Sequence, residues 1–274
     1  GLDSTLTMLV SLEAMKKLGR PSSDVVCISM PGFGTSSRTR GQSEALAKAS
    51  DVTFQEIDIT DTVRSHFKDI GQDENDYSIT YENAQARERT QILLDLGNKI
   101  NAILVAGSDL SELFCGWMSY GGDHLYHYGT NISVPKTLVQ HLIKFYKDHK
   151  TTNQSLKDVL QAVLDTTISP ELLPLDKDGE ISQSTQEVLG PYLVIDFMMF
   201  HFLRNGFSIN KIIHLATRTF EGVYSEEQLS TWINSTFTRF KRSQFKRTMA
   251  APGCKVGSCS LSPRGDARYC DELE

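Results

Sequence analysis

Apolar residues follow three patterns in the first half of the chain: helical spacing, alternation with polar residues as in TFQEIDI at 53–59, and short continuous runs. Apolar residues at Leu6, Leu9, Val10, Ala14 and Leu18 follow one face of an N-terminal helix. Short continuous apolar runs, such as DVVCISM at 24–30, are typical of parallel strands buried on both faces. We expect strands at 24–30, 53–59 and 103–106, and further helices at 41–50, 61–70, 81–96 and 110–117, with a polar loop at 31–40.

The alternation stops near residue 118, and only helical patterns follow. A long loop rich in Gly, Tyr and His spans 119–131, which is unusual in a compact domain and favours a functional role. Helices are expected at 136–149, 155–165, 191–205, 208–216 and 226–245, followed by a tail without clear periodicity at 248–274. This order predicts an α/β fold with a doubly wound parallel sheet in about residues 1–150 and an all-α portion in about 151–247.

Composition narrows the function classes. The 274 residues are 39% apolar, and the longest apolar run, 192–203, is too short to span a membrane. The net charge of −6 argues against a nucleic-acid partner, because phosphate contacts need a basic surface. The odd count of five cysteines indicates reduced thiols and a cytoplasmic location. The spacing of Cys254, Cys259 and Cys270 matches no common zinc site.

The first five residues, GLDST, have the composition of an anion-binding turn. A helix start offers free N–H groups and a positive dipole end. Gly1 allows close approach of a ligand, Ser4 offers a hydroxyl to a phosphate, and Asp3 can hold a divalent cation. A plain helix cap is the alternative, since Asp and Ser are common there. In a doubly wound sheet this turn, the loop at 31–40 and the turn at Gly107 would meet at the carboxyl ends of the strands, where ligands bind.

Several stretches together resemble a known family. The GLDST turn resembles the end of the SGGxDS pyrophosphate-binding loop of the N-type ATP pyrophosphatases. The chain is further similar to the NAD synthetases, and nearest to the synthetase domain of the glutamine-dependent type, over nearly its whole length. The stretches that carry this similarity are PGFGTSSRT at 31–39, YENAQARERT at 81–90, GSDLSELFCGWMSY at 107–120, SVPKTL at 133–138, SPEL at 169–172 and KVGSCSLSPRGD at 255–266.

The resemblance implies an ATP-dependent amidation of deamido-NAD⁺ to NAD⁺. In that reaction the nicotinate carboxylate attacks the α-phosphate of ATP, pyrophosphate leaves, and ammonia then displaces AMP. Mg²⁺ and ATP are the implied cofactor and co-substrate, and a homo-oligomer is expected. Glutamine-dependent members also carry a glutaminase domain, which this chain lacks. We therefore expect a truncated synthetase domain that begins within a motif and uses free ammonia by itself.

The resemblance also implies roles for individual residues. Asp3 and Glu112 are the implied Mg²⁺ ligands. The implied ATP-binding residues are Gly1, Leu2, Asp3, Ser4, Arg87, Gly107, Lys136 and Ser169. The implied deamido-NAD-binding residues are Asn83, Glu112, Trp117, Met118, Ser119, Tyr120, Asn131 and, from the C-terminal tail, Lys255. The family usually has GTGDLSE where this chain has AGSDLSE at 106–112, so Gly107 replaces a Thr, and Ser108 is the expected substitute for its hydroxyl.

Two other functions remain open on the sequence. One is a different N-type ATP pyrophosphatase, such as a GMP-synthetase-like or tRNA-modifying enzyme; the acidic charge and the lack of a CxxC motif disfavour tRNA thiolation. The other is a helical interaction module that no longer binds nucleotide. The basic stretch at 239–247 is either a solvated helix face or a phosphate-facing patch. The enzymatic hypothesis requires that Asp3, Glu112 and Lys136 converge in the folded chain.

Overall fold

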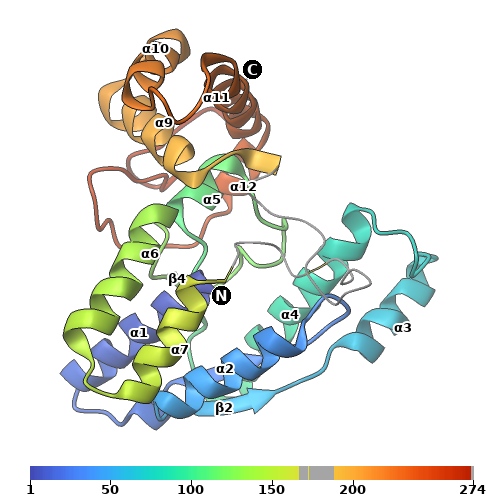
Figure 1. Cartoon of the computed structure of the whole chain (residues 1–274). Helices are drawn as coiled ribbons and strands as arrows, with labels where there is room; N and C mark the ends of the chain where they lie inside the picture. Colours follow the sequence, from blue (N-terminus) through green and yellow to red (C-terminus); the bar gives the residue numbers. More distant parts are fainter. Residues whose placement is uncertain (167–171, 173–187, 273–274) are drawn as a thin grey trace.

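The computed structural model describes residues 1–166, 172 and 188–272 of the chain (Figure 1). It is a mixed α/β structure that is mostly helical, and its strands are parallel. Strand β1 (Val26–Ser29) pairs with β2 (Thr53–Glu56), so that Val26 faces Thr53. Strand β3 (Val105–Ala106) pairs with β4 (Tyr128–Gly129). The prediction of parallel strands alternating with helices is therefore confirmed.

The described residues do not show the single doubly wound sheet that the sequence predicts. The four strands of the described residues form two separate pairs, β1–β2 and β3–β4. The order of elements along a chain indicates parallel strands but does not reveal which strands share hydrogen bonds. Strand β4 also lies inside the segment expected to be a loop. On one side it pairs with β3. On the other side the Gly129 N–H donates to Pro252 O at 2.9 Å, so this segment is held between β3 and the C-terminal tail.

Four helices enclose one hydrophobic core: α1 (Leu2–Lys17), α2 (Ser37–Ala49), α6 (Lys136–Phe145) and α7 (Gln154–Leu164). Figure 1 shows them together below the helical part. Helix α2 begins inside the predicted loop because the Ser36 hydroxyl accepts from Thr39 N at 3.1 Å and caps it. Helix α6 begins at residue 136 as predicted, directly after Pro135, which suits a helix start. It ends earlier than predicted, in a π-helical turn, η2 (Tyr146–Lys150).

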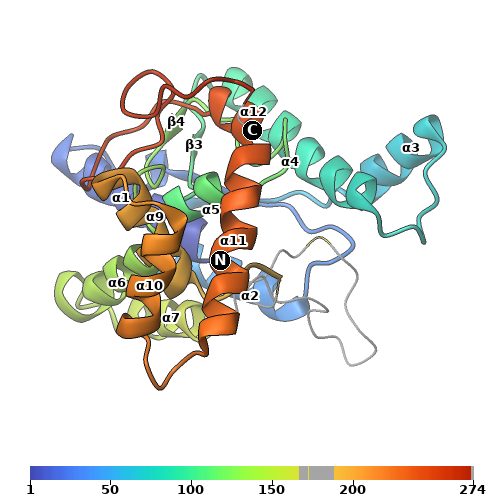
Figure 2. The same cartoon turned by 90° about the horizontal axis from the view of Figure 1, so that it is seen from above.

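A second core lies under α3 (Thr60–Ile70) and the first turns of α4 (Ile79–Ile100), where Phe33, Phe67 and Tyr81 pack their rings together. Figure 2 shows α3 and α4 extending to one side, away from α9 and α10. A short 3₁₀ turn, η1 (Ser22–Asp24), precedes β1. Helix α4 extends beyond the predicted 81–96 at both ends. Its C-terminal end lies after residue 100, because Asn101 adopts the left-handed conformation that ends the helix there.

The third core joins α5 (Leu110–Cys115) to the helical part. It is formed with α9 (Tyr192–Asn205), α10 (Ile209–Thr219) and α11 (Glu226–Arg242). The helix expected over 226–245 is interrupted at Ser243, where α12 (Gln244–Thr248) begins. The tail then returns to the α/β part, where the Ser133 hydroxyl donates to Cys254 O at 2.7 Å. No helix of the described residues has the length and apolar content needed to cross a membrane.

The five cysteines are all free thiols with different exposure. Cys254 and Cys270 are exposed, Cys115 and Cys259 are buried, and burial raises the pKa of Cys27 to about 11. Because the thiolate is the reactive form, we expect Ellman's reagent at pH 8 to label Cys254 and Cys270 rapidly in the native protein. The other three should react only after denaturation. Peptide mapping by mass spectrometry identifies the labelled thiols, and rapid labelling of Cys27 would contradict the burial seen here.

Candidate active site

Three helix starts bring acidic side chains and one lysine to the same place. Asp3 lies in the first turn of α1, and Lys136 is the first residue of α6. Asp109 caps α5: its Oδ1 accepts from Glu112 N at 2.8 Å, and Glu112 Oε2 accepts from Asp109 N at 3.4 Å. This capping box fixes the backbone that carries both acids.

The Lys136 ammonium lies at the centre of this group. Its Nζ is 2.7 Å from Asp3 Oδ2, 2.7 Å from Asp109 Oδ2 and 2.8 Å from Glu112 Oε1. The side chains of Lys136 and Asp109 are 1% and 0% exposed, whereas that of Glu112 is 18% exposed. The structure thus brings together the three residues on which the enzymatic hypothesis depends. We refer to Asp3, Asp109 and Glu112 as the carboxylate cluster.

Burial and mutual repulsion control the charges in this cluster. Burial raises the pKa of Asp109 above its usual range, and it raises the pKa of Glu112 to about 7 although Lys136 opposes the shift. Burial alone would lower the pKa of Lys136, but the three neighbouring carboxylates raise it well above 10.5. Lys136 therefore faces an excess of acidic groups, which favour its charged form.

The carboxylate cluster fits a divalent cation. One ligand oxygen from each of Asp3, Asp109 and Glu112 lies within 4.8 Å of the others. Asp3 Oδ1 is a buried oxygen without a hydrogen-bond partner among the described residues, and Asp109 Oδ2 is buried with the Lys136 ammonium at 2.7 Å as its cationic neighbour. Oxygen ligands of this kind are those that Mg²⁺ prefers. Asp109 is not among the site residues that the sequence predicts; the signal for it is an acid that closely follows a strand, at the edge of the sheet where ligands bind.

A buried carboxylate from the helical part supports the lysine. Ser111 Oγ accepts from Lys136 N at 2.9 Å and donates to Asp196 Oδ1. Asp196 Oδ2 accepts from both the backbone N–H and the hydroxyl of Thr137, at 3.0 and 2.7 Å. Asp196, on α9, thereby ties the start of α6 to α5. Sequence reasoning missed it, although an acid within the apolar run YLVIDFMMF was a visible signal.

We expect Asp196→Asn to lower the free energy of unfolding by about 2 kcal/mol. The new side-chain N–H₂ is a donor, and it would face either the Ser111 hydroxyl or the Thr137 N–H, both of which now donate to the carboxylate. Thermal unfolding followed by circular dichroism measures this. Asp158→Asn is the matched control, since Asp158 is an exposed helical acid that accepts from Gln154. Equal midpoints for the two variants would show that Asp196 does not hold the α5–α6 junction.

The turn at Gly107 is packed against α1 by a buried amide. Asn131 is fully buried, and its Nδ2 donates to Asp3 O at 3.0 Å and lies 3.3 Å from Thr7 Oγ1. A Cβ at Gly107 would lie only 2.3 Å from Thr7 Oγ1 and 2.8 Å from Asp3 O. The Thr that the resemblance predicts at this position therefore does not fit without a shift of Thr7, Asn131 and the backbone of α1. Ser108, the expected substitute, is buried and donates to Asp123 O at 3.2 Å.

The other candidate ATP-binding residues differ in their exposure and position. Gly1 and Ser4 are exposed at the start of α1, where the Ser4 hydroxyl donates to Gly1 O at 3.2 Å, whereas Leu2 is buried in the core. Arg87 is exposed on α4, and its Nε donates to Tyr120 O at 3.1 Å. Ser169 lies outside the described residues.

The candidate deamido-NAD-binding segment 117–120 is held from behind by α12. Lys246 Nζ donates to Gly116 O and Met118 O at 2.8 and 2.6 Å, and the Met118 side chain is buried in the core. These contacts explain part of the basic stretch, because Lys246, like the buried Arg247, satisfies carbonyls at the end of α5. The aromatic Trp117 lies 4.9 Å from the Arg239 guanidinium carbon, while the exposed Tyr120 packs beside His124 and Phe245.

Ser119 and two more distant candidates complete the set. Ser119 N donates to Asp123 Oδ1 at 2.7 Å, which shapes the segment. Asn83 is half-buried on α4, and the exposed Lys255 forms an ion pair with Asp266. Within the described part of the chain, neither Asn83 nor Lys255 forms a hydrogen bond or ion pair with the carboxylate cluster.

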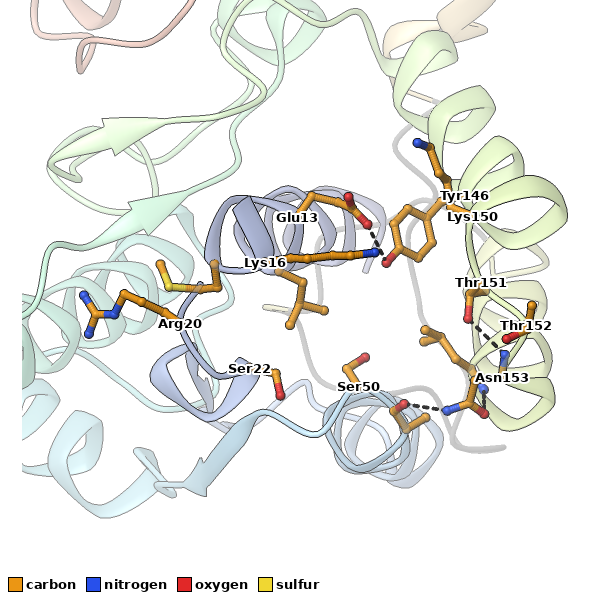
Figure 3. A pocket seen from close by; sticks show the side chains of 14 residues that line it. Glu13, Lys16, Arg20, Ser22, Ser50, Tyr146, Lys150, Thr151, Thr152 and Asn153 are labelled. Carbon is orange, nitrogen blue, oxygen red and sulfur yellow. Dashed lines mark hydrogen bonds between the residues drawn. The ribbon is translucent and has the colours of Figure 1, made fainter. Parts of the chain in front are cut away.

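A separate cavity lies near the opposite end of α1 (Figure 3). Its volume is about 430 Å³, and its walls come from α1, α2, η2 and α7. Tyr146 and Glu13 meet across it by a hydrogen bond of 3.3 Å. It contains no residue of the predicted site.

The fold and the site together define a class of protein. It is an α/β protein in which three acids and one lysine meet at the starts of helices, where a divalent cation and phosphate groups can bind. The family follows from comparison. Residues 1–250 match the family described as NAD synthase, and the chain belongs to that family.

Individual relatives agree with this assignment. The chain is 40% identical over 291 aligned residues to a glutamine-dependent NAD(+) synthetase from Mycobacterium leprae, covering 98% of this chain and 43% of the relative. It is 26% identical over 260 residues to the enzyme of the same name from Aquifex aeolicus, covering 94% of this chain and 41% of that one. The chain therefore spans less than half the length of these relatives.

A solved structure shares the fold. The glutamine-dependent NAD(+) synthetase from Cytophaga hutchinsonii superposes with a TM-score of 0.70 at 18% identity, covering 90% of this chain and 38% of that one.

Proposed function

We propose that this chain is the synthetase part of a glutamine-dependent NAD⁺ synthetase and catalyses the ATP-dependent amidation of deamido-NAD⁺. The observation that carries the proposal is the meeting of Lys136 with Asp3, Asp109 and Glu112 at the start of α1. Family membership supports the choice of substrates. Ammonia would come from glutamine hydrolysis elsewhere in the full-length protein, or from solution for this chain by itself.

The site residues suit the departure of pyrophosphate from ATP. The first turn of α1, from Gly1 to Ser4, presents backbone N–H groups to the phosphates. Asp3, Asp109 and Glu112 would hold Mg²⁺, which neutralises charge on the leaving group when bound. Lys136 adds a positive charge from α6, and Asn131 keeps the Gly107 turn against α1. We assign Arg87 to a nucleotide phosphate, and Ser169 stays a prediction.

The second substrate lies, in this proposal, between α4 and the segment after α5. Asn83, the segment 117–120 and Lys255 would contact deamido-NAD⁺, with Tyr120 as the exposed aromatic ring. Glu112 and Asn131 would lie between the two substrates. The α/β part of about 1–150 and the helical part of about 151–247 form one enzyme domain, and the tail of 248–274 closes the site. We further propose a single doubly wound sheet in the full-length protein, a homo-oligomer and a cytoplasmic location.

The test is an assay of NAD⁺ and pyrophosphate formation with ATP, Mg²⁺ and an ammonium salt, with and without deamido-NAD⁺. We expect pyrophosphate release to depend on deamido-NAD⁺ and to match NAD⁺ formed. Glutamine should replace the ammonium salt only in the full-length protein. Pyrophosphate release with xanthosine monophosphate or tRNA in place of deamido-NAD⁺ would overturn the proposal in favour of another ATP pyrophosphatase.

A further inference from the structure

The carboxylate cluster contains a cation of its own, and this has a consequence for metal binding. Lys136 Nζ lies within 2.8 Å of an oxygen from each of Asp3, Asp109 and Glu112. The same three side chains are those whose ligand atoms lie close enough together to hold a metal ion. An ammonium and a divalent cation cannot both occupy this position.

The ammonium satisfies the cluster incompletely. Its Nζ lies within 2.8 Å of Asp3 Oδ2, Asp109 Oδ2 and Glu112 Oε1, so its three N–H groups serve three carboxylates. Asp3 Oδ1 is buried and has no hydrogen-bond partner among the described residues. An ammonium donates along three fixed directions, whereas a metal ion has no directional N–H groups to align. A metal ion can therefore also use the Asp3 oxygen that the lysine leaves unpaired.

The balance of charge in the carboxylate cluster also favours a divalent cation over the lysine. With all three acids ionised, Lys136 supplies one positive charge against three negative ones, and the pair Lys136–Asp109 is almost completely shielded from water. A divalent cation would neutralise the excess that the lysine leaves. The side chain of Asp109 is 0% exposed and its backbone is fixed by the α5 capping box, so it is the member of the cluster least able to move.

The geometry points to an exchange of cations: the Lys136 ammonium occupies the divalent-cation position in the metal-free protein, and a divalent cation displaces it while Asp109 stays as the fixed ligand. The stand-in keeps buried carboxylates from repelling one another until the metal arrives. The displaced ammonium then becomes available to the triphosphate; only this last step rests on the proposed function.

Mn²⁺ binding in the absence of nucleotide tests the exchange. The free Mn²⁺ signal in electron paramagnetic resonance gives the affinity of the chain and of three variants. We expect Lys136→Met to bind Mn²⁺ at least about tenfold more tightly, because the competing charge is removed. Asp109→Asn should bind about tenfold more weakly. Lys144→Met is the matched control, since Lys144 is an exposed lysine of α6 paired with Asp148, and its Mn²⁺ affinity should be unchanged.

A measurement on the unmodified chain covers the case in which Lys136→Met does not fold. Lys136 should resist acetylation by an N-hydroxysuccinimide ester in the metal-free protein and become several times more reactive when Mn²⁺ is added, as judged by peptide mass spectrometry. Unchanged Mn²⁺ affinity in a folded Lys136→Met variant, or unchanged Lys136 labelling on addition of Mn²⁺, overturns the exchange. Neither measurement uses ATP or deamido-NAD⁺, so a failed exchange is distinguishable from a failed assignment of the reaction.

Discussion

Glu112→Gln is expected to reduce ATP-dependent NAD⁺ formation by about 10²-fold or more, with little change in thermal stability. The amide keeps the shape of the side chain, and its oxygen can still accept from Asp109 N in the capping box. The variant loses the negative charge that now lies 2.8 Å from Lys136 Nζ and that would hold Mg²⁺. Initial rates of NAD⁺ formation, together with the unfolding midpoint, measure both effects.

Glu226→Gln is the control for this substitution. Glu226 also lies in the first turn of a helix, α11, but it is exposed in the helical part. It should keep the rate of the unmodified chain. If the Glu112 variant also kept that rate, the assignment of Glu112 to the metal would be wrong.

Gly107→Thr is expected to destabilise this chain by about 3 kcal/mol. The new Cβ would lie 2.3 Å from Thr7 Oγ1 and 2.8 Å from Asp3 O, so the turn and α1 must separate. For a chain of this size the change corresponds to a fall of about 6–12 °C in the unfolding midpoint. Activity should fall as well, because Asp3 moves with the backbone of α1.

The double variant Thr7→Ala/Gly107→Thr separates the two contacts. Removing the Thr7 hydroxyl should recover about 1–2 kcal/mol of the loss, because the closest clash disappears, while the crowding against Asp3 O stays. Gly41→Thr is the control, since a Cβ at Gly41 has no atom within 4 Å. A double variant no more stable than Gly107→Thr would mean that Thr7 and residue 107 do not share this space.

Local patterns predicted much of the secondary structure but not its pairing. The start of α6 at Lys136 follows from Pro135. The strand at 26–29 follows from its apolar run, and the strand at 53–56 follows from the alternation of apolar and polar residues in TFQEIDI. The two separate strand pairs could not be foreseen, because hydrogen bonding between strands depends on tertiary packing. The break at Ser243 was missed for a similar reason: the apolar spacing continues across it.

The site was predictable only where a motif marked it. Asp3, Glu112 and Lys136 were selected by resemblance, and the structure places them together. Asp109 and Asp196 were not selected, since an acid at a helix cap or within an apolar helix has several structural uses. Their contacts come from segments far away in sequence; Thr137 and Asp196, for example, are 59 positions apart.

The hydrogen bonds of Asp196 link the packing of the helical part to the position of the lysine. Asp196 belongs to α9, whereas Ser111 belongs to α5 and Thr137 to α6, so a loosening of α9 reaches Lys136 through this carboxylate. Moderate heating should therefore inactivate the protein before its helices melt, and drift in the sequence of the distant α9–α11 core would be constrained by catalysis as well as by folding.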